Sequence, residues 1–313
     1  MSATSFPGDA KEPVRPGTPE SKRELATRRT ITLTGGTRLS FLTAGNASAP
    51  AVLLLHGFPN SARSFRGIIP VLARTAFVIA PDLPGFGESD PLPSASFEAF
   101  AEAVAELLDH LAVGPRFIYL HDFGAPVGLR LAMAAPDRVL GLVIQNGNAH
   151  RTGLGPQWAD TMAFWSAPNE HNEAAATAHL TLEGIRAQYV AGVPAEVADR
   201  ISPSVWEEDW QVMCRPGRME TQRALIADYA RHVARFDAIA HYLAARQPPA
   251  LMVWGRHDAF FEIAETVSWM QALPRMEAHI LDGGHFLLET HAETAAALLL
   301  DFIRRFAPAS REA

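Results

Sequence analysis

The sequence predicts an α/β fold in which a mostly parallel sheet of eight strands is flanked by helices and carries an inserted helical cap. Strand-like and helix-like patterns alternate in both halves of the chain, and such alternation is typical of parallel sheets. The alternation stops between residues 150 and 246, which indicates an insertion. With 313 residues, 48% of them hydrophobic, the chain is long enough to bury the core of one large domain.

Short runs of branched and aromatic apolar residues predict the strands. Residues 30–34 and 39–43 alternate polar and apolar side chains around Gly35-Gly36, which is the pattern of a β-hairpin. The other runs are mostly continuous, as expected for parallel strands that are buried on both faces. They cover residues 52–56, 77–80, 116–120, 139–145, 250–254 and 278–281.

Helices are predicted where apolar residues recur at helical spacing. This spacing is present over residues 97–111, 263–273 and 292–306. Residues 1–28 are rich in Pro, Ser, Glu and Lys and have no apolar core, so we expect them to form a disordered tail.

The domain organisation follows from these patterns. We expect a core built from residues 29–148 and 247–313, interrupted by a helical cap over residues 149–246 that is rich in Trp and Tyr.

Charge and cysteine content restrict the class of protein. A formal charge of −7 and a pI near 5.9 argue against nucleic acid or an anionic membrane as a partner. The single cysteine, Cys214, excludes an intrachain disulfide. No run approaches the roughly 20 apolar residues of a membrane span. We expect a cytoplasmic protein, a monomer or homodimer, with no membrane partner, no metal and no cofactor.

Asp122 is predicted to lie at a turn between the strand over residues 116–120 and a helix. Such a turn exposes its residue at the top of a sheet, above the positive end of the helix dipole. A carboxylate in this place is a nucleophile that forms esters with carbon electrophiles. It is poorly suited to cleaving ordinary esters or amides, because its acyl product would be an anhydride.

Two backbone amides near Asp122 are expected to stabilise developing negative charge. The segment His56-Gly57-Phe58-Pro59 closes a predicted strand, and the N–H of Phe58 is expected to point into the site. The N–H of Phe123, directly after Asp122, would be the second donor of this oxyanion hole.

Asp258 and His285 are the expected partners of Asp122. Each follows a predicted strand, Asp258 within Trp254-Gly255-Arg256-His257-Asp258 and His285 within Gly283-Gly284-His285-Phe286. The chain order of nucleophile, acid and histidine indicates a catalytic triad. His285 would be the base, and Asp258 would hold its ring in the required tautomer.

The motifs HGFP, DLPGFGESD, HDFG, WGRHD and GGHF together resemble the α/β-hydrolase superfamily, in the branch of epoxide hydrolases and haloalkane dehalogenases. The resemblance covers about residues 29–148 and 247–308. It implies that Asp122 attacks the substrate and that water activated by His285 then hydrolyses the alkyl-enzyme ester.

Three positions depart from the patterns of this branch. Haloalkane dehalogenases place a tryptophan directly after the nucleophile and tend to have a polar residue within HGxP. This chain has Phe123 and Phe58 there, and neither side chain has a donor for a halide. Epoxide hydrolases usually have a glycine two residues before the nucleophile, where this chain has Leu120.

The resemblance also implies one or two cap tyrosines that protonate the oxygen of an opening epoxide. Tyr229 and Tyr189 are the candidates, and Tyr229 is favoured because it lies in a helical pattern shortly before the chain returns to the core. The alternative is that each tyrosine only packs within the cap, since amphipathic aromatic residues are easily buried.

We therefore expect a hydrolase with an aspartate nucleophile that opens an epoxide to a diol, with a small hydrophobic substrate and water as its partners. The first alternative is a dehalogenase of a haloalkane, or of a haloacid if Arg186 or Arg231 binds the carboxylate. The second alternative is a non-catalytic ligand-binding protein on the same fold.

Overall fold

The computed structural model describes residues 26–308, and over this range it contains an eight-stranded sheet with the order β1-β2-β4-β3-β5-β6-β7-β8. Strand β2 pairs antiparallel with β1 and β4, and the remaining neighbours are parallel. The strands are β1 (Thr27–Thr32), β2 (Arg38–Ala44), β3 (Ala51–Leu55), β4 (Phe77–Pro81), β5 (Arg116–His121), β6 (Val139–Gln145), β7 (Ala250–Gly255) and β8 (Glu277–Leu281). The predicted fold class is confirmed.

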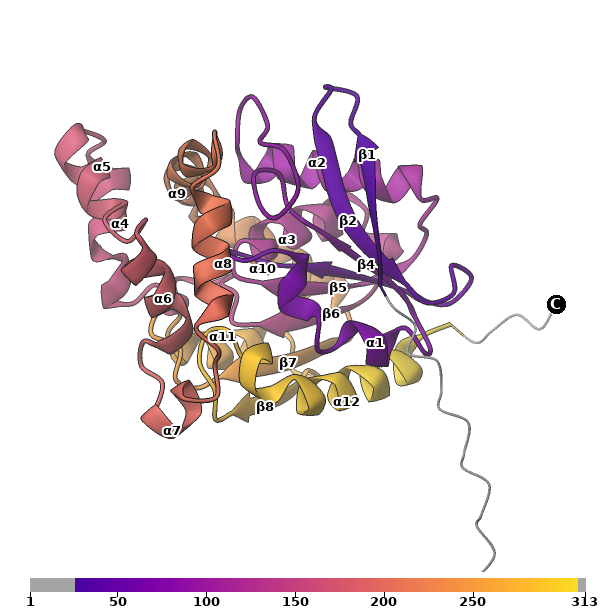
Figure 1. Cartoon of the computed structure of the whole chain (residues 1–313). Coiled ribbons are helices and arrows are strands. Elements are labelled where there is room, and N and C mark those ends of the chain that lie inside the picture. Colours follow the sequence, from indigo (N-terminus) through magenta and orange to yellow (C-terminus); the bar gives the residue numbers. More distant parts are fainter. Residues whose placement is uncertain (1–25, 309–313) are drawn as a thin grey trace, which may run out of the picture.

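Helices cover both faces of the sheet (Figure 1). Short α1 packs against the long α12, which also contacts β6 and β7. On the other face α2 and α10 both contact α3. The helices are α1 (Ile69–Leu72), α2 (Phe97–His110), α3 (Gly124–Ala134), α4 (Ala159–Ser166), α5 (Glu170–Ala176), α6 (Leu182–Val190), α7 (Ala195–Ala198), α8 (Ser204–Met213), α9 (Arg218–Val233), α10 (Phe236–Arg246), α11 (Ala264–Ala272) and α12 (Leu288–Phe306).

The strand at the centre of the sheet shows why the apolar patterns were informative. All six residues of β5 are buried, because strands flank it on both sides and helices cover both faces. Such a strand needs apolar side chains on both faces, so its pattern is continuous rather than alternating.

The observed bounds differ from the expected ones mainly in the first strand and the last helix. The first strand was expected over 30–34 and is observed as Thr27–Thr32, so it begins inside the range expected for the disordered tail. Most of that tail lies outside the described residues. The last helix was expected from residue 292 but begins at Leu288, and it has a non-helical residue, His291, directly before the expected start.

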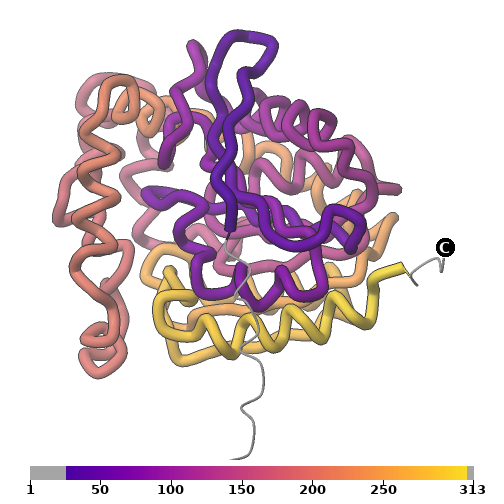
Figure 2. The backbone as a smooth tube through the Cα atoms, turned by 45° about the vertical axis from the view of Figure 1, so that its right-hand side comes forward, coloured from indigo at the N-terminus to yellow at the C-terminus, as the bar shows by residue number. Residues whose placement is uncertain are grey.

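The segment between β6 and β7 forms α4 to α10. Figures 1 and 2 both show α4 to α9 along one side of the molecule, beside the sheet. Helix α10 was expected to belong to the cap, but it contacts α3 and α11 beside the sheet. Among the helices of residues 26–308, none combines the length and the apolar character needed to cross a membrane.

Candidate active site

Asp122 lies at the turn between β5 and α3, at the carboxyl end of a central strand. Its φ of 47° is in the left-handed region, a strained conformation for a residue other than glycine. Neighbouring segments approach it closely. A Cβ added to Gly124 would lie 2.3 Å from the carbonyl oxygen of Leu55, and one added to Gly57 would lie 2.0 Å from Asp122 Oδ1. Glycine at these two positions therefore makes the turn possible.

The carboxylate of Asp122 is held by backbone amides. The N–H of Phe58 donates to Asp122 Oδ1 at 2.6 Å, and the N–H of Phe123 also interacts with the carboxylate. Burial raises the pKa of Asp122 above 3.8, while the charge of His285 and these two amides act in the opposite direction. The structure thus brings Phe58 and Phe123 to the carboxylate, as expected from the sequence.

Asp258 and His285 form a hydrogen-bonded pair beside Asp122. His285 Nδ1 lies 2.8 Å from Asp258 Oδ2, and both side chains are 1% exposed. The backbone N–H groups of Phe260 and Phe261 donate to Asp258 Oδ1 at 2.7 and 3.1 Å. The acid therefore accepts hydrogen bonds on both oxygens, and it fixes the imidazole with Nδ1 as the protonated nitrogen.

The other ring nitrogen of His285 faces Asp122. Nε2 lies 3.8 Å from Asp122 Oδ2 and has no hydrogen-bond partner within the described part of the chain. Burial alone would lower the pKa of His285, but the charge and hydrogen bond of Asp258 and the charge of Asp122 together raise it above 6.5. A base of this kind can accept a proton near neutral pH.

Asp122 lines a cavity of about 250 Å³ that lies between the core and the cap. Most of its apolar walls are aromatic or small, and its polar walls contain no lysine or arginine among the residues the structure describes. The lining residues are Phe58, Asp122, Phe123, Gln157, Trp158, Asp160, Thr161, Ala175, Ala176, Ala178, His179, Gln188, Ile226, Tyr229, Phe260 and Phe261.

Tyr229 on α9 lines this cavity together with Asp122. Its side chain is 1% exposed, and its buried hydroxyl makes no hydrogen bond of normal geometry within the range 26–308, although it interacts with the nearby Asn148 amide. Burial and the charge of Asp122 raise the pKa of Tyr229 well above 10.0, whereas the Asn148 amide acts to lower it. The hydroxyl is therefore protonated at neutral pH and lies near the carboxylate, which suits a proton donor.

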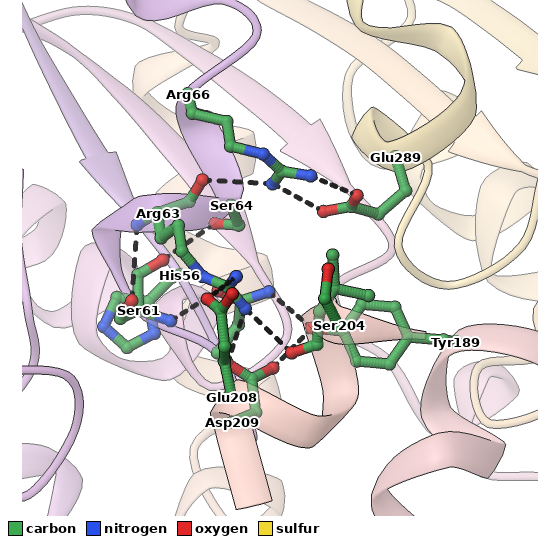
Figure 3. A network of polar contacts seen from close by, with 12 residues as sticks. His56, Ser61, Arg63, Ser64, Arg66, Tyr189, Ser204, Glu208, Asp209 and Glu289 are labelled. Carbon is green, nitrogen blue, oxygen red and sulfur yellow. Dashed lines mark hydrogen bonds and ion pairs between the residues drawn. The ribbon is translucent and has the colours of Figure 1, made fainter. Parts of the chain in front are cut away.

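Tyr189 on α6 has a different place, and its expected role as a proton donor in the cavity is not supported. Its hydroxyl donates to Asp209 Oδ2 (Figure 3). The same hydroxyl accepts from Asn60 Nδ2 at 2.8 Å, and Tyr189 does not line the cavity. Its ring stacks on Phe286 with centroids 4.2 Å apart. The hydroxyl is thus occupied in a contact between the cap and the core.

Asp209 connects this contact to the segment of the core between β3 and β4. Its carboxylate also accepts from Arg63 at 3.2 Å, and Arg63 pairs in addition with Glu208 (Figure 3). Burial raises the pKa of Asp209 to about 7, against the opposing effects of Tyr189 and Arg63. The acidic residues on α8 therefore serve as a link between cap and core.

Neither arginine considered for a haloacid lies in the cavity. Arg186 has a side chain that is 48% exposed and pairs with Glu183 at 2.9 Å. Arg231 is 81% exposed at its side chain and lies 3.5 Å from Asp228. The expectation that one of them binds a carboxylate in the site is wrong, because both point to solvent.

Several residues of the site were not predicted from the sequence. Asn146, just after β6, donates from Nδ2 to Asp258 Oδ2 at 2.8 Å and accepts the N–H of Gly255 at 3.0 Å, so it positions the acid. The polar run Gln145-Asn146-Gly147-Asn148 at the end of a buried strand was the available signal. His179 and Gln188, which line the cavity, gave no signal because their position depends on how the cap folds.

A buried carboxylate at the turn between β5 and α3, with an Asp–His pair on the loops after β7 and β8 of a mostly parallel sheet, defines an α/β enzyme site. Comparison with known proteins agrees, since residues 50–292 match the alpha/beta hydrolase fold family. An uncharacterized hydrolase of Saccharomyces cerevisiae is 34% identical over 272 residues, which cover 85% of this chain and 93% of the yeast protein. The chain therefore belongs to the α/β hydrolase family and is a hydrolase.

Other similar proteins have different activities. A fluoroacetate dehalogenase of Burkholderia sp is 28% identical over 273 residues, which cover 82% of this chain and 88% of that protein. The solved structure of the epoxide hydrolase CorEH matches with a TM-score of 0.74 at 24% identity, covering 90% of this chain and 99% of that one. At this identity the structural likeness shows the fold alone, so the substrate has to be argued from the site.

Proposed function

We propose that this hydrolase uses Asp122 as a nucleophile and opens an epoxide to a diol through a covalent alkyl-enzyme ester. The observation that carries the proposal is that Tyr229, whose buried hydroxyl stays protonated at neutral pH, lines the same cavity as Asp122. An epoxide needs both groups, because its carbon is attacked while its oxygen requires a proton.

In the first step an oxygen of Asp122 attacks one epoxide carbon. The bond between this carbon and the ring oxygen breaks, and the oxygen takes the proton of the Tyr229 hydroxyl. The aromatic side chains beside Asp122, Phe58 and Phe123, favour this step, since a carboxylate with few water molecules around it is a stronger nucleophile. The product is an ester between Asp122 and the substrate.

In the second step His285 takes a proton from water, and the resulting hydroxide attacks the carbonyl carbon of the Asp122 ester. The N–H groups of Phe58 and Phe123 stabilise the oxyanion that forms. The ester bond to the substrate then breaks, and the departing oxygen takes the proton from His285. The remaining proton of the water returns from the Asp122 carboxyl group to Tyr229, which completes the cycle.

Dehalogenation is the second candidate, and it is favoured by the likeness to the fluoroacetate dehalogenase. Two observations favour the epoxide instead. The Trp158 indole, which could have held a halide, already donates to the carbonyl oxygen of Phe260 at 2.7 Å. A haloacid would also bring a carboxylate into a cavity whose described lining contains Asp122 and Asp160 but no basic side chain of lysine or arginine.

The proposal is tested by comparing diol formation from styrene oxide with halide release from bromoalkanes and fluoroacetate. We expect diol formation that disappears in Asp122→Asn, with mass spectrometry used to exclude deamidation back to aspartate. Halide release at a higher kcat/KM than diol formation would contradict the proposal and favour dehalogenation.

A further inference from the structure

Gln188 is a buried polar side chain in the cavity that the proposed reaction does not use. It lies on α6, it is 8% exposed, and it lines the same cavity as Asp122. Its amide makes no hydrogen bond to another residue of the described range. The amide is accessible from the cavity rather than sealed inside the protein. An amide that has no protein partner and stays open to the cavity is free to hydrogen-bond a ligand there, and such a bond contributes about 0.5–1.5 kcal/mol.

His179, in the loop between α5 and α6, lines the same cavity as Gln188. Its ring meets the ring of Phe58 edge-on, with centroids 5.6 Å apart at an angle of 90°. The loop is packed closely on α6. A Cβ added to Gly184 would lie only 1.9 Å from the carbonyl oxygen of His179. Gly184 and Gln188 are four residues apart and therefore share one face of the helix, so His179 and Gln188 are held on the same side of the cavity.

The two side chains present complementary hydrogen-bonding groups. Burial lowers the pKa of His179 below 6.5, so its ring is neutral, and one of its nitrogens interacts with the carbonyl oxygen of Ala176. In a neutral imidazole the nitrogen that faces a carbonyl carries the proton, which leaves the other as an acceptor. Gln188 has both a donor and an acceptor. A hydroxyl group, which donates once and accepts, satisfies this pair, whereas a carboxylate has no proton for His179.

We propose that Gln188 and His179 form a polar subsite that binds a hydroxyl group of the substrate, so that the preferred epoxides carry a hydroxyl on their carbon chain. This inference rests on the proposed epoxide chemistry. The small side chains Ala175, Ala176 and Ala178 leave space beside the subsite for the chain that joins the hydroxyl to the epoxide ring.

The test compares epoxides that differ only in a terminal hydroxyl or methyl group. Glycidol is paired with butene oxide, and the epoxide of pentenol with that of hexene. In the wild type we expect a higher kcat/KM for the hydroxylated member of at least one pair. Gln188→Met keeps the length of the side chain and removes the amide, and it should lower this preference about ten- to hundredfold. His179→Leu, which leaves Gln188 in place, should lower it as well.

Gln271→Met, on the exposed face of α11 and outside the cavity, is the matched control and should keep the wild-type preference. The subsite is refuted if the wild type prefers the methyl member of both pairs, or if Gln188→Met and Gln271→Met have equal preferences. Failure of the underlying function gives a different result, because the wild type would then form no diol from any of these epoxides.

Discussion

Replacing each of the two cap tyrosines by phenylalanine separates catalysis from cap stability. Tyr229 and Tyr189 are both 1% exposed and both lie on cap helices, but of the two only Tyr229 lines the cavity that contains Asp122. Tyr229→Phe removes the single expected proton donor to the epoxide oxygen. Loss of one such donor lowers a rate by about 10²–10³-fold, or about 2.7–4 kcal/mol.

For the free energy of unfolding the order of the two variants should be reversed, with the larger loss in Tyr189→Phe. Tyr229→Phe removes a buried hydroxyl that interacts with the Asn148 amide but makes no hydrogen bond of normal geometry, so the free energy of unfolding should stay within about 1 kcal/mol of the wild type. Tyr189→Phe removes a hydrogen bond to the Asp209 carboxylate and should lower the free energy of unfolding by about 1.5–3 kcal/mol. Its rate of epoxide opening should change only a few-fold.

Two assays decide the comparison. Single-turnover kinetics measure the formation of the alkyl-enzyme ester, and urea unfolding measures stability. The assigned roles would be refuted if Tyr189→Phe slowed ester formation more than Tyr229→Phe did, or if Tyr229→Phe retained more than a third of the wild-type rate.

Three further predictions concern the carboxylate, the base and the link between cap and core. Gly57→Ala should lower kcat at least about hundredfold, because the added Cβ would lie 2.0 Å from Asp122 Oδ1. Gly35→Ala is the control and should be fully active, because its added Cβ would meet no atom within 4 Å. Hydrolysis of the ester, followed by quenched flow, should slow as the pH falls below the pKa of His285, which lies above 6.5, and a rate that is independent of pH would argue against His285 as the base. Asp209, whose pKa of about 7 exceeds the ordinary 3.8, binds more protons in the folded state, so its contribution to stability is lost as the pH rises through about 7. The Tm of the wild type should therefore fall more between about pH 5 and pH 8 than that of Asp209→Asn, and parallel Tm curves would contradict this.

The sequence was sufficient to predict how Asp122, Asp258 and His285 come together. Each follows a strand with a strongly apolar pattern, and the carboxyl ends of parallel strands meet at one edge of the sheet. The distances of 2.8 Å between His285 and Asp258 and 3.8 Å between His285 and Asp122 follow from that shared edge.

The roles within the cap could not be predicted in the same way. Tyr189 and Tyr229 lie in similar helical patterns, and what distinguishes them is contact with distant residues. Tyr189 forms hydrogen bonds with Asn60 in a core loop and with Asp209 on another helix, which are 129 and 20 residues away in the sequence. Gln188 could not be identified from the sequence for the same reason, since an amide in a helix gives no periodic signal of the cavity that it faces.

The most direct test of Asp122 as the nucleophile is a single-turnover reaction with styrene oxide in water enriched in heavy oxygen. We expect the diol of the first turnover to contain no label, because its new oxygen comes from the Asp122 carboxylate. The label should then be found in the peptide that contains Asp122. A labelled diol in the first turnover, with an unlabelled Asp122 peptide, would show direct attack by water and contradict covalent catalysis.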